Sequence, residues 1–185
     1  MGENQLNGSI PQQVGQLESL NNIFLYDNHL KGHIPISLGN MNNLAYVYLY
    51  DNQHSGSIPP EIRKLPNLVE LDINNNSLTS PIPSSIGNLE KLTLLHICNN
   101  QLSGSIPPEI GDSKALISLR IERNIIFGSI PTSLGTLNNL TFLHLYDNKL
   151  SGTIPKELGH LKSITSLQLG KNQLNGNVPC WVRIA

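Results

Sequence analysis

Hydrophobic and polar residues alternate in short segments that recur at a fixed interval along the chain. The segments have the form apolar-x-apolar, as in Leu71-Asp72-Ile73 and Leu143-His144-Leu145. Ile-Pro pairs recur with them, with the isoleucine at positions 10, 34, 58, 82, 106, 130 and 154, and Val178-Pro179 continues the series. Successive pairs are always 24 residues apart. A period of this length indicates a repeat protein, in which each repeat contacts only its neighbours.

Each position of the repeat predicts a local structure. The alternating segment predicts a short β-strand whose apolar side chains face the core. The asparagine six residues before each isoleucine, such as Asn28 or Asn100, predicts a ladder of buried amides that satisfy backbone groups. A glycine two residues before the isoleucine predicts a bend. The sequence Pro-x-x-Leu-Gly, as at 131–135, predicts one helical turn that the glycine ends.

Stacked repeats of this kind predict an α/β solenoid. The full unit, LxxLxLxxNxLxGxIPxxLGxL, resembles the plant-specific subclass of leucine-rich repeats, which has a concave parallel β-sheet and short 3-10 or helical turns on the convex side. The phrases NQLSGSIPPEIG and NKLSGTIPKELGHL are similar to those of plant receptor-like kinase ectodomains. The resemblance covers residues 4–179.

The resemblance also implies a function. It implies a module without enzymatic activity that binds a peptide or a partner protein on its concave face, with a co-receptor ectodomain as a further partner. It implies a place outside the cell or on the exterior of the plasma membrane. The first residues, Met1-Gly2-Glu3-Asn4, do not form a signal peptide.

The two ends of the chain lack the paired-cysteine caps that the resemblance implies. The chain starts within a repeat and ends at Pro179-Cys180-Trp181-Val182-Arg183 without a second cysteine nearby. We therefore interpret residues 1–185 as a single solenoid of about eight repeats with both ends partial, as in a fragment or a truncated product. Terminal repeats need polar caps to stay soluble, so end-to-end self-association is expected.

Charge and cysteine content exclude several classes of protein. The net charge is −1 and only 14% of the residues are charged, which argues against nucleic-acid binding. No stretch of about 18 apolar residues could span a membrane. Cys98 and Cys180 are too few and too far apart for a disulfide framework or a zinc site. We expect Cys98 to face outward from the sheet as a free thiol.

Five residues depart from the repeat. His54 stands at a core leucine position, Ser80 and Arg63 replace glycines, Ser113 replaces a leucine, and Pro81 adds a second proline to its repeat. A solenoid tolerates isolated departures because each repeat depends only on its neighbours. A buried imidazole without a partner is costly, so His54 is expected to turn outward or to find a hydrogen-bonding partner.

The polar residues of the strand segments should form columns on the concave face. Neighbours within a column lie about 4.8 Å apart, so seven strands give a groove of roughly 30 Å, enough for an extended peptide of about eight to ten residues. The first three strands carry aromatic and acidic side chains, and the later strands carry a more basic set. The candidate ligand-binding residues are Phe24, Tyr26, Tyr46, Tyr48, Tyr50, Asp51, Glu70, Asp72, His96, Arg120, Arg123, His144 and Tyr146.

This distribution of side chains predicts a ligand with separated features. The tyrosines are expected to act as aromatic platforms, and Asp51 and Asp72 as acceptors for basic groups. Arg120 and Arg123 are expected to contact a carboxylate or a sulfate. An extended peptide that is basic at one end and acidic or carboxylate-terminated at the other would fit.

The sequence LYDN occurs three times, ending at Asn28, Asn52 and Asn148. Its leucine and asparagine belong to the repeat. The tyrosine and aspartate positions hold other residues elsewhere, such as Cys98-Asn99 and Gly170-Lys171. We therefore interpret the tyrosine and the aspartate as variable surface.

Catalysis is not indicated, and no cofactor or metal ion is predicted. Asp51 and Asp72 could approach each other as a pair of carboxylates, but an open groove offers no pocket that would raise the pKa of one of them. His96 and His144 should lie two strands, roughly 10 Å, apart, which is too far to share a metal ion without a third ligand. Asn7, Asn75 and Asn139 begin Asn-x-Ser/Thr sequences and are candidate glycosylation sites, and a glycan on Asn75 would crowd the groove edge.

Three other functions remain open. The repeat also resembles that of polygalacturonase-inhibiting proteins, which block a fungal enzyme. It resembles plant ice-binding proteins as well, because the position before Ile-Pro holds a column of mostly small polar residues, which His33 and Pro81 interrupt. The chain could also be a pure scaffold or an engineered repeat fragment.

Overall fold

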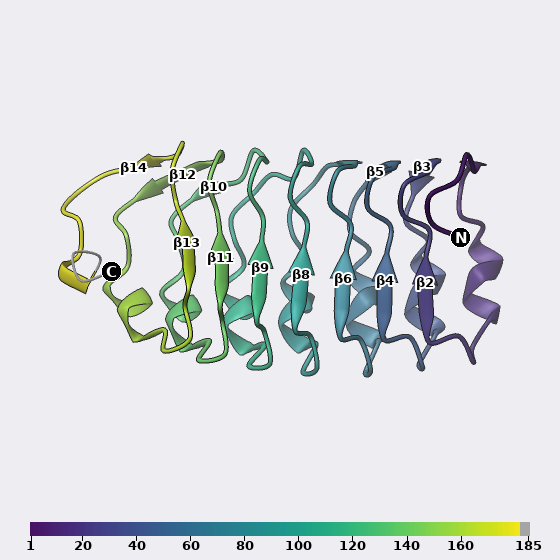
Figure 1. Ribbon diagram of the computed structural model, residues 1–185, viewed down its shortest axis with the longest axis horizontal. Helices are drawn as coiled ribbons and strands as arrows, with labels where there is room; N and C mark the ends of the chain where they lie inside the picture. The colour runs from purple at the N-terminus through teal and green to yellow at the C-terminus, as the bar shows by residue number, and fades with distance from the viewer. Residues whose placement is uncertain (182–185) are drawn as a thin grey trace.

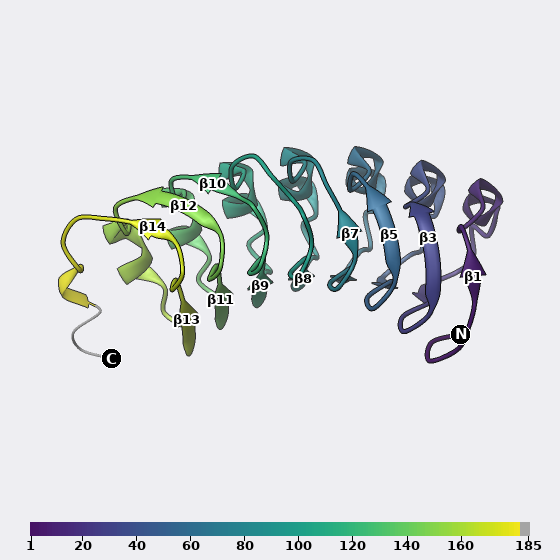
Figure 2. The ribbon, with the colours of Figure 1, turned by 90° about the horizontal axis from the view of Figure 1, so that it is seen from above.

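The computed structural model describes residues 1–181 and confirms the predicted solenoid. Figure 1 shows the strands of the concave face side by side, with the 3-10 helices behind them. Figure 2, seen from above, shows those strands on the inner side of an arc and the helices on its outer side. Strands β1 and β14 lie toward opposite ends of the arc in Figure 2, and the elements that contact each other belong to neighbouring repeats.

Seven parallel strands form the concave sheet and follow one another in chain order. Identical positions of successive repeats pair, so that Ile23 lies opposite Val47 and Val47 opposite Leu71. The predicted 24-residue register is therefore confirmed. The strands are β2 (Asn22–Phe24), β4 (Tyr46–Tyr48), β6 (Glu70–Asp72), β8 (Leu94–His96), β9 (Ser118–Arg120), β11 (Phe142–His144) and β13 (Ser166–Gln168).

A second set of strands runs along the flank of the solenoid. It forms a four-stranded sheet of β1 (Asn7–Gly8), β3 (His29–His33), β5 (Gln53–Gly56) and β7 (Ser77–Leu78), and a three-stranded sheet of β10 (Phe127–Gly128), β12 (Lys149–Gly152) and β14 (Gln173–Leu174). Between the two sheets the strand pairing is reduced to an isolated bridge of Pro81 with Ser103, while the backbone N–H groups of Gln101 and Ser103 still donate to the carbonyl oxygens of Leu78 and Ser80. The interruption follows from the sequence, because Pro81 has no N–H to donate and Ser80 replaces the glycine of the bend while keeping its left-handed φ of 71°.

The structure describes seven complete 3-10 helices on the convex side, each directly after a proline. They are η1 (Gln12–Gln16), η2 (Ile36–Asn40), η3 (Pro60–Lys64), η4 (Ser84–Asn88), η5 (Pro108–Asp112), η6 (Thr132–Thr136) and η7 (Lys156–His160). The predicted role of their glycine was wrong. It does not end the turn in a left-handed conformation. Instead, a Cβ on Gly135 would lie 2.2 Å from the backbone oxygen of Glu157 on the next helix. Close stacking of helices therefore requires glycine, and η3, which has Arg63 at this position, packs more loosely on η4.

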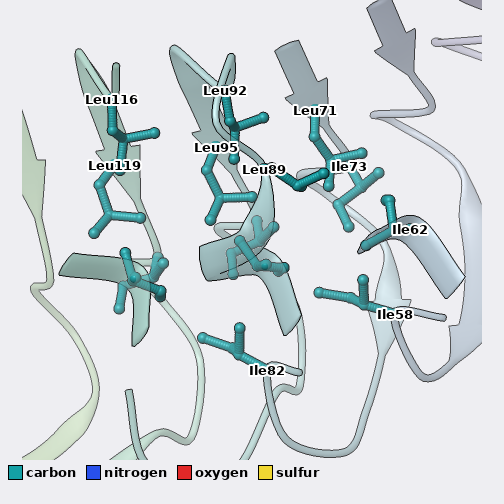
Figure 3. Packing of buried hydrophobic residues seen from close by; sticks show 14 of the residues in the cluster. Ile58, Ile62, Leu71, Ile73, Ile82, Leu89, Leu92, Leu95, Leu116 and Leu119 are labelled. Atoms are coloured by element: carbon teal, nitrogen blue, oxygen red, sulfur yellow. The ribbon is translucent and has the colours of Figure 1, made fainter. Parts of the chain in front are cut away.

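The core is a stack of leucine and isoleucine layers, one per repeat (Figure 3). Leu71, Leu95 and Leu119 repeat at the same position and are at most 1% exposed. Each such side chain contributes about 1.5–3 kcal/mol by burial, before the loss of chain entropy is subtracted. Because a layer is covered only by the layers on either side, this stabilisation exists only in the stacked solenoid.

The predicted asparagine ladder is confirmed, and it joins neighbouring repeats. Asn100 Oδ1 accepts a hydrogen bond from the backbone N–H of Leu78 at 2.9 Å. Its Nδ2 lies 3.1 Å from the carbonyl oxygen of Ile73 in the preceding repeat and 3.1 Å from that of Cys98 in its own. One amide thus satisfies backbone groups of two repeats where the chain leaves the concave sheet.

His54 neither turns outward nor finds a partner, so the prediction for it was wrong. The side chain is fully buried on β5, and neither ring nitrogen makes a hydrogen bond of normal geometry. Burial lowers the pKa of the imidazole, and the nearby Gly32 backbone opposes this effect only in part. The backbone N–H of His54 still donates a hydrogen bond to Oδ1 of Asn76. The asparagine ladder therefore fixes the backbone of β5 even though burial of the imidazole is unfavourable.

Candidate functional site

Aromatic side chains on the first two strands of the concave sheet form two stacked pairs. The rings of Phe24 and Tyr48 have centroids 4.7 Å apart, and so do those of Tyr26 and Tyr50. The separation matches the spacing of adjacent strands because the paired residues hold identical positions in the repeat. Tyr48 and Tyr50 also meet at a tilted angle, with centroids 6.2 Å apart, which joins the two pairs into one cluster.

Stacking decides which part of each ring a ligand can reach. The paired rings cover each other, and Gly2 lies against the ring of Tyr26, since a Cβ on Gly2 would be 2.5 Å from Cζ of that tyrosine. Each stacked pair covers one face of each of its two rings and leaves the ring edges uncovered. The role of the tyrosines as aromatic platforms stays a prediction.

Carboxylates adjoin the aromatic cluster on the next strand. Glu70 accepts a hydrogen bond from the hydroxyl of Tyr48. Burial raises the pKa of Tyr48, and the bond to Glu70 raises it further. Burial also raises the pKa of Tyr50. Both hydroxyls therefore stay protonated at neutral pH and can donate hydrogen bonds. Phe24, Tyr26, Tyr48, Tyr50 and Glu70 form what we call the aromatic-acidic section.

Asp51 and Asp72, which the sequence predicts to lie near each other, bind different partners. Asp51 Oδ1 accepts a hydrogen bond from Asn75 Nδ2 at 2.6 Å, and Asp72 Oδ1 accepts one from Asn74 Nδ2 at 2.5 Å. Each of the two carboxylates is thus oriented by a neighbouring amide.

A chain of polar contacts crosses the middle of the sheet. Asp72 Oδ2 lies 3.4 Å from Nδ1 of His96, and Nε2 of His96 lies 2.8 Å from Oγ of Ser118. A matching contact joins His144 to Ser166 at 2.9 Å. The two histidines thus bind serines rather than each other. The sequence did not identify either serine, because each lies 22 residues after its histidine and reaches it only when neighbouring strands pair.

Arg120 and Glu122 form an ion pair in the later strands. Nε and Nη2 of Arg120 lie 3.0 and 2.7 Å from Oε1 of Glu122. The carboxylate of Glu122 is 1% exposed, and its Oε2 has no hydrogen-bonding partner. An unsatisfied buried oxygen costs about 1–3 kcal/mol or more. Glu122 was not among the candidate residues. Its place two residues after Arg120 in the sequence is the signal that could have identified it.

Arg123 remains available at the edge of the groove. Its guanidinium lies over the ring of Tyr146, with Cζ 5.7 Å from the centroid, and Nη1 contacts Oδ1 of Asn99 at 3.4 Å. The part of the chain that the structure describes contains no ion pair to Arg123. Lys171 is also exposed further along the same column. These two cations form what we call the basic section.

Two expectations from the sequence need correction. Cys98 does not face outward, because its side chain is 2% exposed, and burial raises the pKa of the thiol to about 12. It is a free cysteine, as predicted. The aspartate of LYDN is also not freely variable. The column of Asp27, Asp51, Asn75, Asn99, Arg123, Asp147 and Lys171 has φ values of 50–58°. This left-handed conformation favours aspartate and asparagine, so the aspartate has a backbone role.

The three candidate glycosylation sites are all exposed. Asn75 donates to Asp51, and Asn139 Nδ2 donates to the carbonyl oxygen of Lys114 at 2.9 Å. Asn7 lies on β1 at the flank. Glycosylation of these residues stays a prediction.

No enclosed pocket lies in the groove among the best-formed cavities of residues 1–181. One of these cavities, of about 740 Å³, is at the N-terminal end of the core and is lined mainly by apolar residues such as Ile10, Ile23 and Leu30. Within the same residues no three metal-ligating side chains of His, Cys, Asp or Glu come together. None of the helices described is long and apolar enough to cross a membrane.

A model of the family described as Leucine Rich Repeat matches residues 43–65, 67–89, 91–113 and 139–161. The parallel concave sheet, the asparagine ladder and this match agree. The chain is a leucine-rich-repeat protein. No curated protein sequence matches this leucine-rich-repeat chain.

Solved structures similar to this leucine-rich-repeat protein include ectodomains of plant receptor kinases. The ectodomain of GASSHO1/SCHENGEN3 from Arabidopsis thaliana, in complex with CASPARIAN STRIP INTEGRITY FACTOR 2, is 38% identical with a TM-score of 0.94, over 97% of this chain and 22% of that one. The Arabidopsis receptor kinase HAESA, in complex with the peptide hormone IDA and the co-receptor SERK1, is 39% identical with a TM-score of 0.94, over 98% of this chain and 30% of that one. The leucine-rich-repeat chain thus spans less than a third of either ectodomain.

A plant ice-binding protein has the same fold. It is 24% identical to the leucine-rich-repeat chain with a TM-score of 0.72, over 97% of this chain and 73% of that one. At this identity the likeness extends to the fold alone.

Proposed function

We propose that this leucine-rich-repeat protein is a recognition module that binds an extended peptide, or an extended segment of a partner protein, on its concave face. We propose further that the module has no catalytic activity and lies on the outside of the cell. A co-receptor ectodomain is proposed as a further partner. The concave sheet is open along its length and has the columns of exposed side chains that such a ligand needs. The likeness to receptor-kinase ectodomains, one of them in complex with a peptide hormone, supports the proposal.

One observation carries it most directly. The aromatic-acidic section joins stacked rings, two protonated tyrosine hydroxyls and the carboxylate of Glu70 within the first three strands of the sheet. Aromatic edges and a carboxylate together suit a basic side chain, because the carboxylate pairs with its charge while the rings contact its aliphatic stem. A purely structural solenoid has no need for four clustered aromatic residues on its concave sheet.

The charges along the sheet support a direction for the ligand. The aromatic-acidic section lies on β2 to β6, whereas the basic section of Arg123 and Lys171 follows β9 and β13. An acidic side chain or a terminal carboxylate would suit the basic section, and Arg123 has its guanidinium oriented by Tyr146. The ligand is therefore expected to be basic at the end over β4 and β6 and acidic at the other.

Ice binding has less support. The column before each Ile-Pro is exposed, but His33 and Pro81 interrupt it, and the strand pairing near Pro81 is reduced to an isolated bridge. A regular ice-matching surface cannot extend across this interruption. An assay of ice recrystallisation tests this alternative, and inhibition of fungal polygalacturonase tests the inhibitor alternative.

A selection from a library of random peptides, displayed against the immobilised protein, tests the proposal. The expected result is enrichment of peptides with a basic residue and, several residues away, an acidic residue or carboxylate. Enriched peptides should bind the double variant Tyr48→Ala/Asp72→Ala more weakly. An absence of enrichment, or equal binding to the variant, would contradict the proposal.

A further inference from the structure

Glu122 is an unusual occupant of its column in the concave sheet. Among residues 1–181 it is the only acidic residue that the structure buries. The equivalent positions of the other repeats hold Tyr26, Tyr50, Asn74, Cys98, Tyr146 and Gly170. The repeat therefore does not require a carboxylate in this place. Burying it has a desolvation cost that no feature shared by the repeats offsets.

The Glu122 carboxylate changes what Arg120 can do. Oε1 lies 3.0 Å from Nε and 2.7 Å from Nη2 of Arg120, so the guanidinium is held by one side. The Arg120 side chain is still 39% exposed. A guanidinium has five N–H donors, and those of Nη1 are not used by Glu122. Arg120 thus offers N–H donors to the groove, while the buried Glu122 carboxylate neutralises its positive charge.

We propose that Glu122 is a specificity-determining residue, which neutralises Arg120 so that this part of the groove accepts an uncharged hydrogen-bond acceptor and disfavours an anion. The acceptor would be a backbone carbonyl or a side-chain amide of the bound peptide, and the inference rests on the peptide-binding function proposed above. An anion placed on Arg120 would also meet the negative charge of Glu122, which cancels most of the attraction. The anionic end of a ligand is left to the basic section of Arg123 and Lys171.

His144 provides an independent reporter of the charge on Glu122. Burial lowers the pKa of this histidine most, the carboxylate of Glu122 raises it, and the guanidinium of Arg120 lowers it. Removing the negative charge of Glu122 should therefore lower the pKa of His144 further. A structural role of Glu122 without a negative charge would leave that pKa unchanged.

Titration of the protein with inorganic sulfate tests the inference without any peptide. The chain has four arginines, so the Nε–Hε resonance of Arg120 can be followed by NMR. In Glu122→Gln, which keeps the shape of the side chain, sulfate should shift this resonance with an affinity about tenfold or more above that of the wild type. Equal sulfate affinity at Arg120 in the two proteins would overturn the proposal.

Two further variants keep the test decisive. Glu18→Gln removes an exposed carboxylate that is not paired with an arginine, and it should leave sulfate binding at Arg120 unchanged. Glu122→Ala also removes the negative charge beside Arg120, and it should raise the sulfate affinity at Arg120 as Glu122→Gln does. Wild-type sulfate affinity in Glu122→Ala would overturn the proposal even if Glu122→Gln does not fold. These sulfate titrations test only the role of Glu122. If they contradict it, the wild type can still bind peptides, so the two proposals are tested independently.

Discussion

The hydroxyl of Tyr48 on β4 donates a hydrogen bond to Oε2 of Glu70 on β6. The two residues are 22 positions apart and meet because their strands pair in register. This bond orients the carboxylate beside the stacked rings. Burial and the bond to Glu70 both raise the pKa of Tyr48, so the interaction can be measured by titration.

Replacing Glu70 by glutamine should lower the pKa of Tyr48 part of the way toward its ordinary value of 10.0, because burial, the larger cause, remains. In the wild type, unfolded chains lose the Tyr48 proton above pH 10 before folded chains do. The contribution of protonated Tyr48 to the free energy of unfolding is therefore fully present below pH 10 and is lost as the pH rises through the raised pKa of the folded protein. Alkaline titration of phenolate absorbance measures the shift, with Glu18→Gln as the matched control. An unchanged titration in Glu70→Gln would show that the hydrogen bond does not form.

Replacing His54 by leucine should stabilise the protein. The change restores the repeat and removes two buried nitrogens without partners, for a gain of about 1–3 kcal/mol in the free energy of unfolding. The pKa of His54 is lowered from its ordinary value of 6.5, so unfolded chains bind the extra proton first as the pH falls. The stability that neutral His54 allows is thus present above pH 6.5 and is lost below it.

Urea unfolding from pH 7.5 to pH 5 measures this effect. His54→Leu should flatten the loss of stability toward acid pH, whereas the exposed control His29→Gln should keep the wild-type slope. The same acid sensitivity in wild type and His54→Leu would mean that His54 is not buried in its neutral form.

Replacing Asn100 by alanine should cost about 3 kcal/mol of unfolding free energy. The change leaves the N–H of Leu78 and carbonyl groups of two repeats without a partner in the interior. Asn4 is the matched control, because it is exposed and bonds only to Met1 and Gly2, so Asn4→Ala should cost about 0.5 kcal/mol or less. Similar costs for the two variants in urea unfolding would contradict a structural ladder.

Replacing Gly135 by alanine should destabilise the protein by about 1–3 kcal/mol, because the added Cβ would lie 2.2 Å from the Glu157 backbone oxygen. Gly170 has open space around it and no left-handed φ, so Gly170→Ala should be nearly neutral. Thermal unfolding of the two variants tests whether close stacking of the convex helices requires glycine. A neutral Gly135→Ala would contradict that reason.

The sequence allowed the fold to be predicted in more detail than the site. Positions that every repeat shares, such as the core leucines and the ladder asparagines, stand out by their regular spacing. The flanking sheet was not predicted, because its backbone pairing does not depend on a recurring side chain. The reason for the helix glycine was also missed, since a glycine letter does not distinguish a left-handed bend from a close approach of two helices.

Side-chain partners within the groove could not be read from the columns alone. Tyr48 with Glu70, His96 with Ser118, and His144 with Ser166 are diagonal contacts between strands, set by side-chain direction rather than by spacing. The burial of Cys98 and Glu122 at positions that are at least partly exposed in other repeats could not be read from the sequence either. Residue type and register therefore identify a groove but not which of its charges are free.

Calorimetric titration of a selected peptide tests the central claim most directly. The protein, the groove variant Tyr48→Ala/Asp72→Ala and the convex-side control Ser84→Ala/Asn88→Ala should be compared after each is shown to be folded. Binding on the concave face predicts that the groove variant loses affinity by about tenfold or more while the control keeps wild-type affinity. Equal affinity of all three proteins would place the ligand elsewhere and contradict the account.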